Sequence, residues 1–239
     1  MSENNLEVQN KAPETSLSIM KSGGLKEIWN VGSAFSQSQI VPKQYQNNIP
    51  NCVVAIEMAN NMKVSPLTVM QNLDIIQGKP SWSSQYVISQ VNSSGRFSPL
   101  QWKINKTDRS LKGLNYQEHE WDNNAKKKIA RDKKFTQDIN DIEFTAFATD
   151  IKSGEVLESP TITLAMAIKE GWYMKTGSKW QTMPELMGRY RAAAFFGRLY
   201  CPEVIHGFQT KEEVIDAEYT VVSDSPEESS NKVVSENAN

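Results

Sequence analysis

Residues 177–200 place a tryptophan, Trp180, directly before a segment that has the pattern of a capped helix. Thr182 and Glu185 have the spacing of a capping box, and Pro184 falls in the first turn, where proline is tolerated. Apolar and small residues recur on one side of this helix at about 100° per residue: Met183, Leu186, Met187, Tyr190, Ala193, Ala194 and Gly197. We expect this side to lie in the core.

The same helix carries three arginines, and two of them have no acidic neighbour in the sequence. Arg191 and Arg198 are seven residues apart, so they lie almost in register on one flank. No acid lies within four residues of either on this helix, so we interpret them as unneutralised guanidinium groups that suit phosphates. Arg189 lies on the opposite flank, where Glu185 can pair with it. The alternative is that all three arginines solvate the helix while Trp180 packs under its amino end.

Basic and aromatic residues are interleaved between residues 100 and 135. The basic ones are Lys103, Lys106, Arg109, Lys112, Lys126, Lys127, Lys128, Arg131, Lys133 and Lys134, and the segment has a net charge of +5. Trp102, Tyr116, Trp121 and Phe135 lie among them, a mixture that suits single strands because bases stack on rings. The alternative is a solvated hairpin whose lysines protect an edge strand. The candidate nucleic-acid contacts are therefore Arg189, Arg191, Arg198, Lys179, Trp180, Lys103, Lys126, Lys127 and Lys128.

The charge of the chain is unevenly distributed. The total is −2, but residues 209–239 carry −6, which leaves the preceding 208 residues at +4. A modestly basic body with an acidic tail fits a nucleic-acid binder better than the total does.

The sequence has few residues that could bind a metal, and it has no signal for export. The sequence contains two cysteines and two histidines, too few and too scattered for a zinc site. We expect reduced, buried thiols. The amino terminus has no apolar run of signal-peptide length, and no stretch has the length of a membrane span. These features predict a cytoplasmic protein with no membrane partner.

The periodicity predicts a compact single domain of the α+β class, in which helices pack over a small antiparallel sheet or hairpin. Residues 1–20 are predicted to be disordered, residues 21–208 to form the domain, and residues 209–239 to form an acidic, mostly disordered tail. Helical spacing covers 25–32, 51–63 (with Asn51 as its cap), 66–73, 85–92 and 161–172. Strand patterns cover 74–77, 98–106, 141–150 and 156–159. Residues 107–135 are predicted to form a long hairpin connection or a mobile loop.

The motifs of common enzymes are missing from the sequence. There is no phosphate-binding Gly-x-x-x-x-Gly-Lys-Ser/Thr motif and no Gly-x-Ser-x-Gly elbow. We therefore expect no catalytic residue and no cofactor. The one enzymatic alternative is a magnesium-dependent nuclease that uses Asp141, Asp150 and Lys152, although a turn after Lys152 explains those charges more simply.

Two stretches together resemble a known family. The first contains Asn60–Leu67, Ile75–Trp82 and Ser94–Phe97; the second is Trp180-x-x-x-Pro184-x-x-Met187 followed by the three arginines. In their order and spacing they resemble the RecT/Redβ-type single-strand annealing proteins of phages and prophages. The resemblance covers about residues 25–215.

The resemblance implies a function that needs no nucleotide turnover. Proteins of this family coat single-stranded DNA and pair it with a complementary strand without ATP, as rings or helical filaments. They usually work beside a 5′→3′ exonuclease in the bacterial host cell. The resemblance implies an α+β core with a hairpin and a DNA groove lined by Arg189, Arg191 and Arg198, with Trp180 anchoring the helix or touching DNA. The acidic tail would compete for the groove or bind the exonuclease or a single-strand-binding protein. A passive coat on single strands is the remaining alternative.

Overall fold

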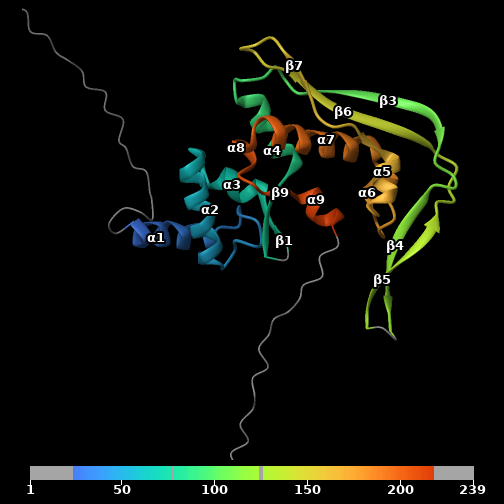
Figure 1. Cartoon of the computed structure of the whole chain (residues 1–239). Helices are drawn as coiled ribbons and strands as arrows, with labels where there is room; N and C mark the ends of the chain where they lie inside the picture. The colour runs from blue at the N-terminus through green and yellow to red at the C-terminus, as the bar shows by residue number, and fades with distance from the viewer. Residues whose placement is uncertain (1–23, 77, 124–125, 218–239) are drawn as a thin grey trace, which may run out of the picture.

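The computed structural model describes residues 24–76, 78–123 and 126–217, and every structural statement below concerns those residues. The fold is α+β, with helices packed against small antiparallel sheets, so the predicted class is confirmed (Figure 1). The predicted disorder of residues 1–20 lies outside the described residues. So do residues 218–239 of the predicted tail.

Three helices form the amino-terminal part: α1 (Gly24–Ser36), α2 (Ile49–Met62) and α3 (Pro66–Asn72). Helix α1 packs closely on α2, because a Cβ added at Gly32 would lie 3.3 Å from Val53. The predicted cap of α2 is wrong by three positions. Asn48 is the cap, and its side-chain oxygen accepts a hydrogen bond of 3.1 Å from the backbone N–H of Asn51.

A small sheet joins residues 73–82 to the carboxyl-terminal end of the described chain. Strands β1 (Leu73–Ile76) and β2 (Lys79–Trp82) form a hairpin, and β9 (Gln209–Thr210) pairs with β2 in parallel. Helix α4 (Ser84–Ser93) follows β2 and is capped by Ser83. Strand β9 and helix α9 (Lys211–Asp216) lie in the segment that the sequence analysis placed in the acidic tail. These residues therefore belong to the packed fold.

The main sheet has the order β3–β6–β7, with β8 also pairing with β6. Its strands are β3 (Gln101–Ser110), β6 (Asn140–Thr149), β7 (Val156–Glu158) and β8 (Ile162–Thr163). In β6 the buried residues alternate with less buried ones, which places Phe144, Ala146 and Ala148 on the inner face. This face packs on α7 (Pro184–Tyr200). A Cβ at Gly188 would lie 2.3 Å from the ring of Phe144, so the helix and the sheet are in very close contact.

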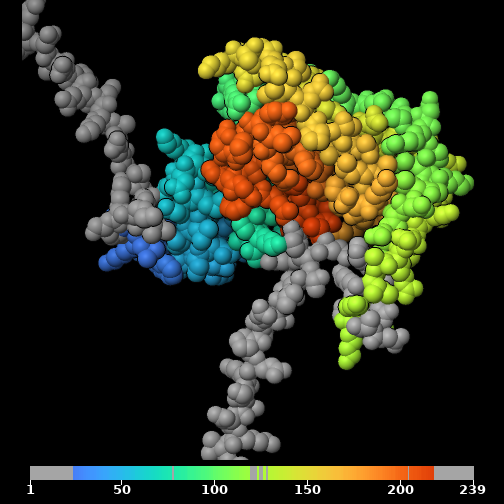
Figure 2. All heavy atoms as spheres, in the orientation of Figure 1, coloured from blue at the N-terminus to red at the C-terminus, as the bar shows by residue number. Residues whose placement is uncertain are grey.

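Between β3 and β6 the chain forms a second hairpin, β4 (Asn115–Asp122) with β5 (Lys127–Lys134). The hairpin interpretation of this segment is confirmed. In Figure 1 the hairpin continues from the end of β3 and bends past α5 (Leu164–Lys169) and α6 (Lys179–Thr182). Figure 2 shows it as an arm that extends beyond the body of the molecule.

Helix α7 begins at Pro184, but not with the predicted capping box. The predicted cap, Thr182, is the last residue of α6, so Met183 is the N-cap and makes no side-chain hydrogen bond. Glu185 pairs with Lys106 at 2.8 Å. Met183 and Leu186 are exposed, so the predicted core side is shifted. The residues of α7 that are buried are Met187, Gly188, Arg191, Ala192, Ala193, Ala194, Phe196 and Gly197. After α7 come α8 (Pro202–Ile205), β9 and α9.

Candidate nucleic-acid interface

Arg191 is buried in an ion-pair cluster, with 7 % of its side chain exposed. One guanidinium nitrogen donates to the carboxylate of Asp216, and another lies 3.5 Å from Oε1 of Glu213. The guanidinium carbon is 4.0 Å from the ring centroid of Trp172. The interpretation of Arg191 as an unneutralised cation is therefore wrong: both acids come from α9, which is distant in the sequence. In this arrangement Arg191 does not reach a phosphate in solution.

Trp180 belongs to the same cluster and is fully buried. Its indole Nε1 donates a hydrogen bond of 3.1 Å to Oδ2 of Asp216, and its ring lies 5.7 Å from that of Trp172. This geometry makes Trp180 an anchor between α6 and α9. The two roles considered for Trp180 were anchoring the helix and touching DNA. Contact with DNA would require this cluster to open.

Arg198 is bound to Glu213 but remains 37 % exposed. Glu213 also forms a capping box with Thr210, whose backbone N–H lies 2.8 Å from Oε2. Burial raises the pKa of Glu213, but the hydrogen bond from Arg198 and further donors outweigh it and hold the pKa below its usual value. The pKa of Asp216 is raised, because burial outweighs the opposing effects of Arg191 and Trp180. Arg198 is therefore also neutralised in the described structure.

The environment of Arg189 differs from that of Arg191 and Arg198. Its guanidinium carbon lies 5.7 Å from the ring centroid of half-buried Trp102, whose Nε1 donates to the Arg189 carbonyl at 3.0 Å. Within the described residues no carboxylate lies within ion-pair distance of Arg189. Glu185 is bound by Lys106, which together with a smaller effect of Arg189 lowers the pKa of Glu185. The arginine that sequence reasoning considered neutralised is thus the one without a bound carboxylate.

The predicted lysines lie on several separate surfaces. Lys103 projects from the outer face of β3, pairs with Glu158 and lies 5.2 Å from the ring centroid of Phe147. Lys126 and Lys127 are exposed where the hairpin turns into β5, and Lys179 is exposed at the start of α6. The side chain of Lys128 is outside the described part of the structure. The nine predicted contacts therefore do not form one cluster.

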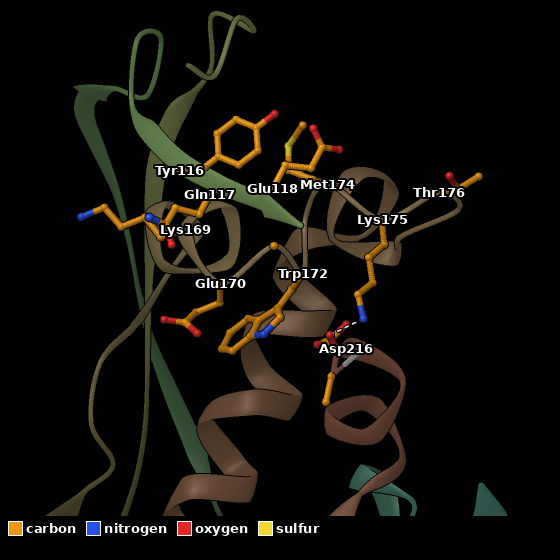
Figure 3. Close-up of a pocket in the computed structure, with 12 residues that line it drawn as sticks. Tyr116, Gln117, Glu118, Lys169, Glu170, Trp172, Met174, Lys175, Thr176 and Asp216 are labelled. Atoms are coloured by element: carbon orange, nitrogen blue, oxygen red, sulfur yellow. Dashed lines mark hydrogen bonds between the residues drawn. The ribbon is translucent and has the colours of Figure 1, made fainter. Parts of the chain in front are cut away.

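The structure contains a pocket of about 730 Å³ that sequence reasoning did not predict. It lies between β4, residues 169–176 and the end of α9 (Figure 3). Its wall includes Trp172, Lys169, Lys175 and Asp216. The ammonium group of Lys175 donates to the backbone carbonyls of Ile215, at 2.9 Å, and of Asp216. The pocket thus combines an indole, two lysines and the carboxylates of Glu118, Glu170 and Asp216 beside the buried arginine cluster.

The acids of the nuclease alternative are not brought together. Asp141 lies at the start of β6 and Asp150 directly after its end, about 30 Å apart along an extended strand. Asp141 is buried, pairs with Arg109 and accepts the backbone N–H of Ala165 at 2.9 Å. Asp150 accepts the backbone N–H groups of Lys152 and Ser153 in a turn. No metal-binding group of three or more such side chains occurs among the described residues.

No protein-family model, curated protein or solved structure gives a significant match with this chain. Within residues 24–76, 78–123 and 126–217, none of the helices has both the length and the apolar character needed to cross a membrane.

Proposed function

We propose that the protein binds single-stranded DNA and anneals complementary strands without ATP. The observation that carries the proposal is the environment of Arg189, which lies over Trp102 with no carboxylate of residues 24–76, 78–123 or 126–217 at ion-pair distance. Lys106 is 70 % exposed. It lies four residues after Trp102, on the same face of β3. A guanidinium group, an indole ring and an ammonium group in one place are the groups that hold phosphates and bases of a single strand.

The hairpin extends this basic surface away from the body. Lys126 and Lys127 are exposed there, and no group in the described structure suggests base-specific reading. Cations spaced along an arm neutralise phosphates, which lowers the repulsion between two strands while their bases pair. Sequence specificity then comes from Watson–Crick pairing and not from the protein. Such a role needs neither nucleotide hydrolysis nor a metal ion.

The proposal includes a homo-oligomer, a ring or helical filament, in which neighbouring subunits present a continuous surface to DNA. It places the protein in the cytoplasm of a bacterial host, in phage recombination. There it would work beside an exonuclease that produces single strands and a protein that binds them. These partners follow from the resemblance to RecT/Redβ-type proteins.

The test is the pairing of two complementary labelled oligonucleotides, with and without the protein, in the absence of ATP. We expect faster pairing with protein, and binding that weakens steeply with salt because counterions are released. Shortening of the strands in magnesium would favour the nuclease. Protection of the strands without faster pairing would favour a passive coat.

Arg189→Gln tests the site itself. The hydrogen bond from Trp102 goes to the backbone carbonyl, so this substitution leaves it in place. We expect weaker binding and slower annealing than for Lys26→Gln, which removes an exposed cation from α1. Equal effects of the two substitutions would show that Arg189 does not contact DNA.

A further inference from the structure

Helix α9 covers a surface that has the chemistry of a single-strand binding site. Beneath it lie Arg191 and Arg198, together with the neighbouring rings of Trp172 and Trp180. Guanidinium groups bind phosphate oxygens in the same geometry as carboxylate oxygens, and indole rings accept stacked bases. Glu213 and Asp216 therefore occupy positions on these arginines that phosphates can take.

The contacts that hold α9 are mostly polar. Glu212 accepts hydrogen bonds from the backbone and hydroxyl of Ser84, at 3.2 and 2.5 Å. Lys211 pairs with Asp74 at 3.0 Å. Of the two apolar residues of α9, Val214 is buried and Ile215 is 55 % exposed. Buried ion pairs give small net stabilisation because both partners lose hydration, so a polyanion can replace these contacts.

The pocket described above leads to this cluster. Asp216 and Trp172 form part of its wall, and Lys175 reaches across to the last carbonyls of α9 (Figure 3). Lys169 lies on the same wall as Glu170, on the side of α5. The wall carries the ammonium groups of Lys169 and Lys175 beside the carboxylates of Glu118, Glu170 and Asp216, and Lys175 is bound to the end of α9. The pocket is therefore a route by which phosphates reach the buried arginines.

We propose that single-stranded DNA enters this pocket and displaces α9, so that Arg191, Arg198 and Trp172 form a second, covered binding site. Phosphates replace Glu213 and Asp216 on the two arginines, beside the indole of Trp172 that lines the pocket. The inference rests on the proposed function, since it names a further contact for the same ligand. It explains how arginines that are neutralised in the free protein take part in binding.

Hydrogen exchange on the unmodified full chain tests the displacement. Backbone amides of residues 211–216 are measured with and without an oligothymidylate. We expect these amides to lose protection when the oligonucleotide binds, while those of β3 and β6 keep it. Unchanged or greater protection of 211–216 in a complex that demonstrably forms overturns the displacement and leaves the proposed function standing. A folded protein that binds no oligonucleotide overturns both.

Glu213→Gln and Asp216→Asn test the competition between carboxylates and phosphates. Each keeps the size of the side chain and removes its charge. We expect tighter binding than for the unmodified protein, because the carboxylate no longer competes with phosphate for its arginine. Glu27→Gln is the matched control, because it removes an exposed carboxylate from α1 and touches no contact of α9 named above. Folded variants with the affinity of the control overturn the inference. If a variant fails to fold, the exchange experiment decides.

Discussion

The α7–α9 cluster and the arm formed by β3 and the hairpin use the same kinds of cation in opposite ways. In the cluster, Arg191 is 7 % exposed and is bound by Asp216 and Glu213. On β3, Lys106 is 70 % exposed and its partner Glu185 also faces solvent. The comparison shows that positive charge in the sequence does not by itself identify an accessible cation. Burial and the origin of the nearest carboxylate decide whether a cation holds the fold or remains accessible.

The two regions also differ in the free energy that is lost when one partner of an ion pair is removed. A buried ion pair loses hydration on both sides, so removing one partner leaves the other charge unsolvated. An exposed pair is hydrated with or without its partner and contributes about 0–1 kcal/mol. The same kind of substitution therefore has a large effect in one region and a small effect in the other.

The largest expected effect is that of Arg191→Met. It keeps an apolar stem beside Trp172 but leaves the buried carboxylate of Asp216 without its cation. We expect the free energy of unfolding to fall by about 3–5 kcal/mol, measured by urea denaturation. Lys106→Gln, which removes one partner of an exposed pair, is the matched control and should change it by less than about 1 kcal/mol. Equal changes would mean that the cluster is not buried in solution.

On the hairpin we expect an effect on binding and not on stability. Lys126→Gln with Lys127→Gln should leave the free energy of unfolding within about 0.5 kcal/mol for each substitution. The salt dependence of single-strand binding should become shallower by about 0.7 for each phosphate that the variant no longer neutralises. Lys26→Gln on α1 provides the comparison. An unchanged slope with both hairpin lysines replaced would remove the hairpin from the path of the DNA.

Much of the fold could be predicted because its helices and strands follow local patterns of apolar residues in the sequence. The alternation of residues 141–150 predicted β6, and helical spacing predicted most of α2 and α4. Helix α9 was missed because it is short and lies in a segment whose acidic composition suggested disorder. Its capping box, Thr210-x-x-Glu213, was the local signal that could have revealed it.

The candidate site could be predicted only in part, because ion pairs form across long separations. The partners of Arg198 and Arg191 lie 15 and 25 residues further along the chain. Glu185 pairs with Lys106 on β3 instead of Arg189 one helical turn away. Residues within one turn of a helix give no information about acids supplied by another element. Sequence reasoning could therefore list the basic residues of α7, but it assigned the neutralised ones wrongly.

The smallest expected effect is on the chemical reactivity of Cys201, at the end of α7. Burial raises the pKa of this thiol to about 11, with a smaller contribution from Glu203. Since the thiolate is the reactive form, about one thiol in a thousand is ionised at pH 8. We expect iodoacetamide to modify Cys201 slowly in the folded protein, with a rate that rises about tenfold per pH unit below that pKa.

Peptide mass spectrometry separates the modification of Cys201 from that of Cys52, and Lys127→Cys supplies an exposed thiol on the hairpin for comparison. Equal rates at the two positions would show that the end of α7 opens as readily as the arm, because a thiol that is buried only part of the time reacts in proportion to its exposure.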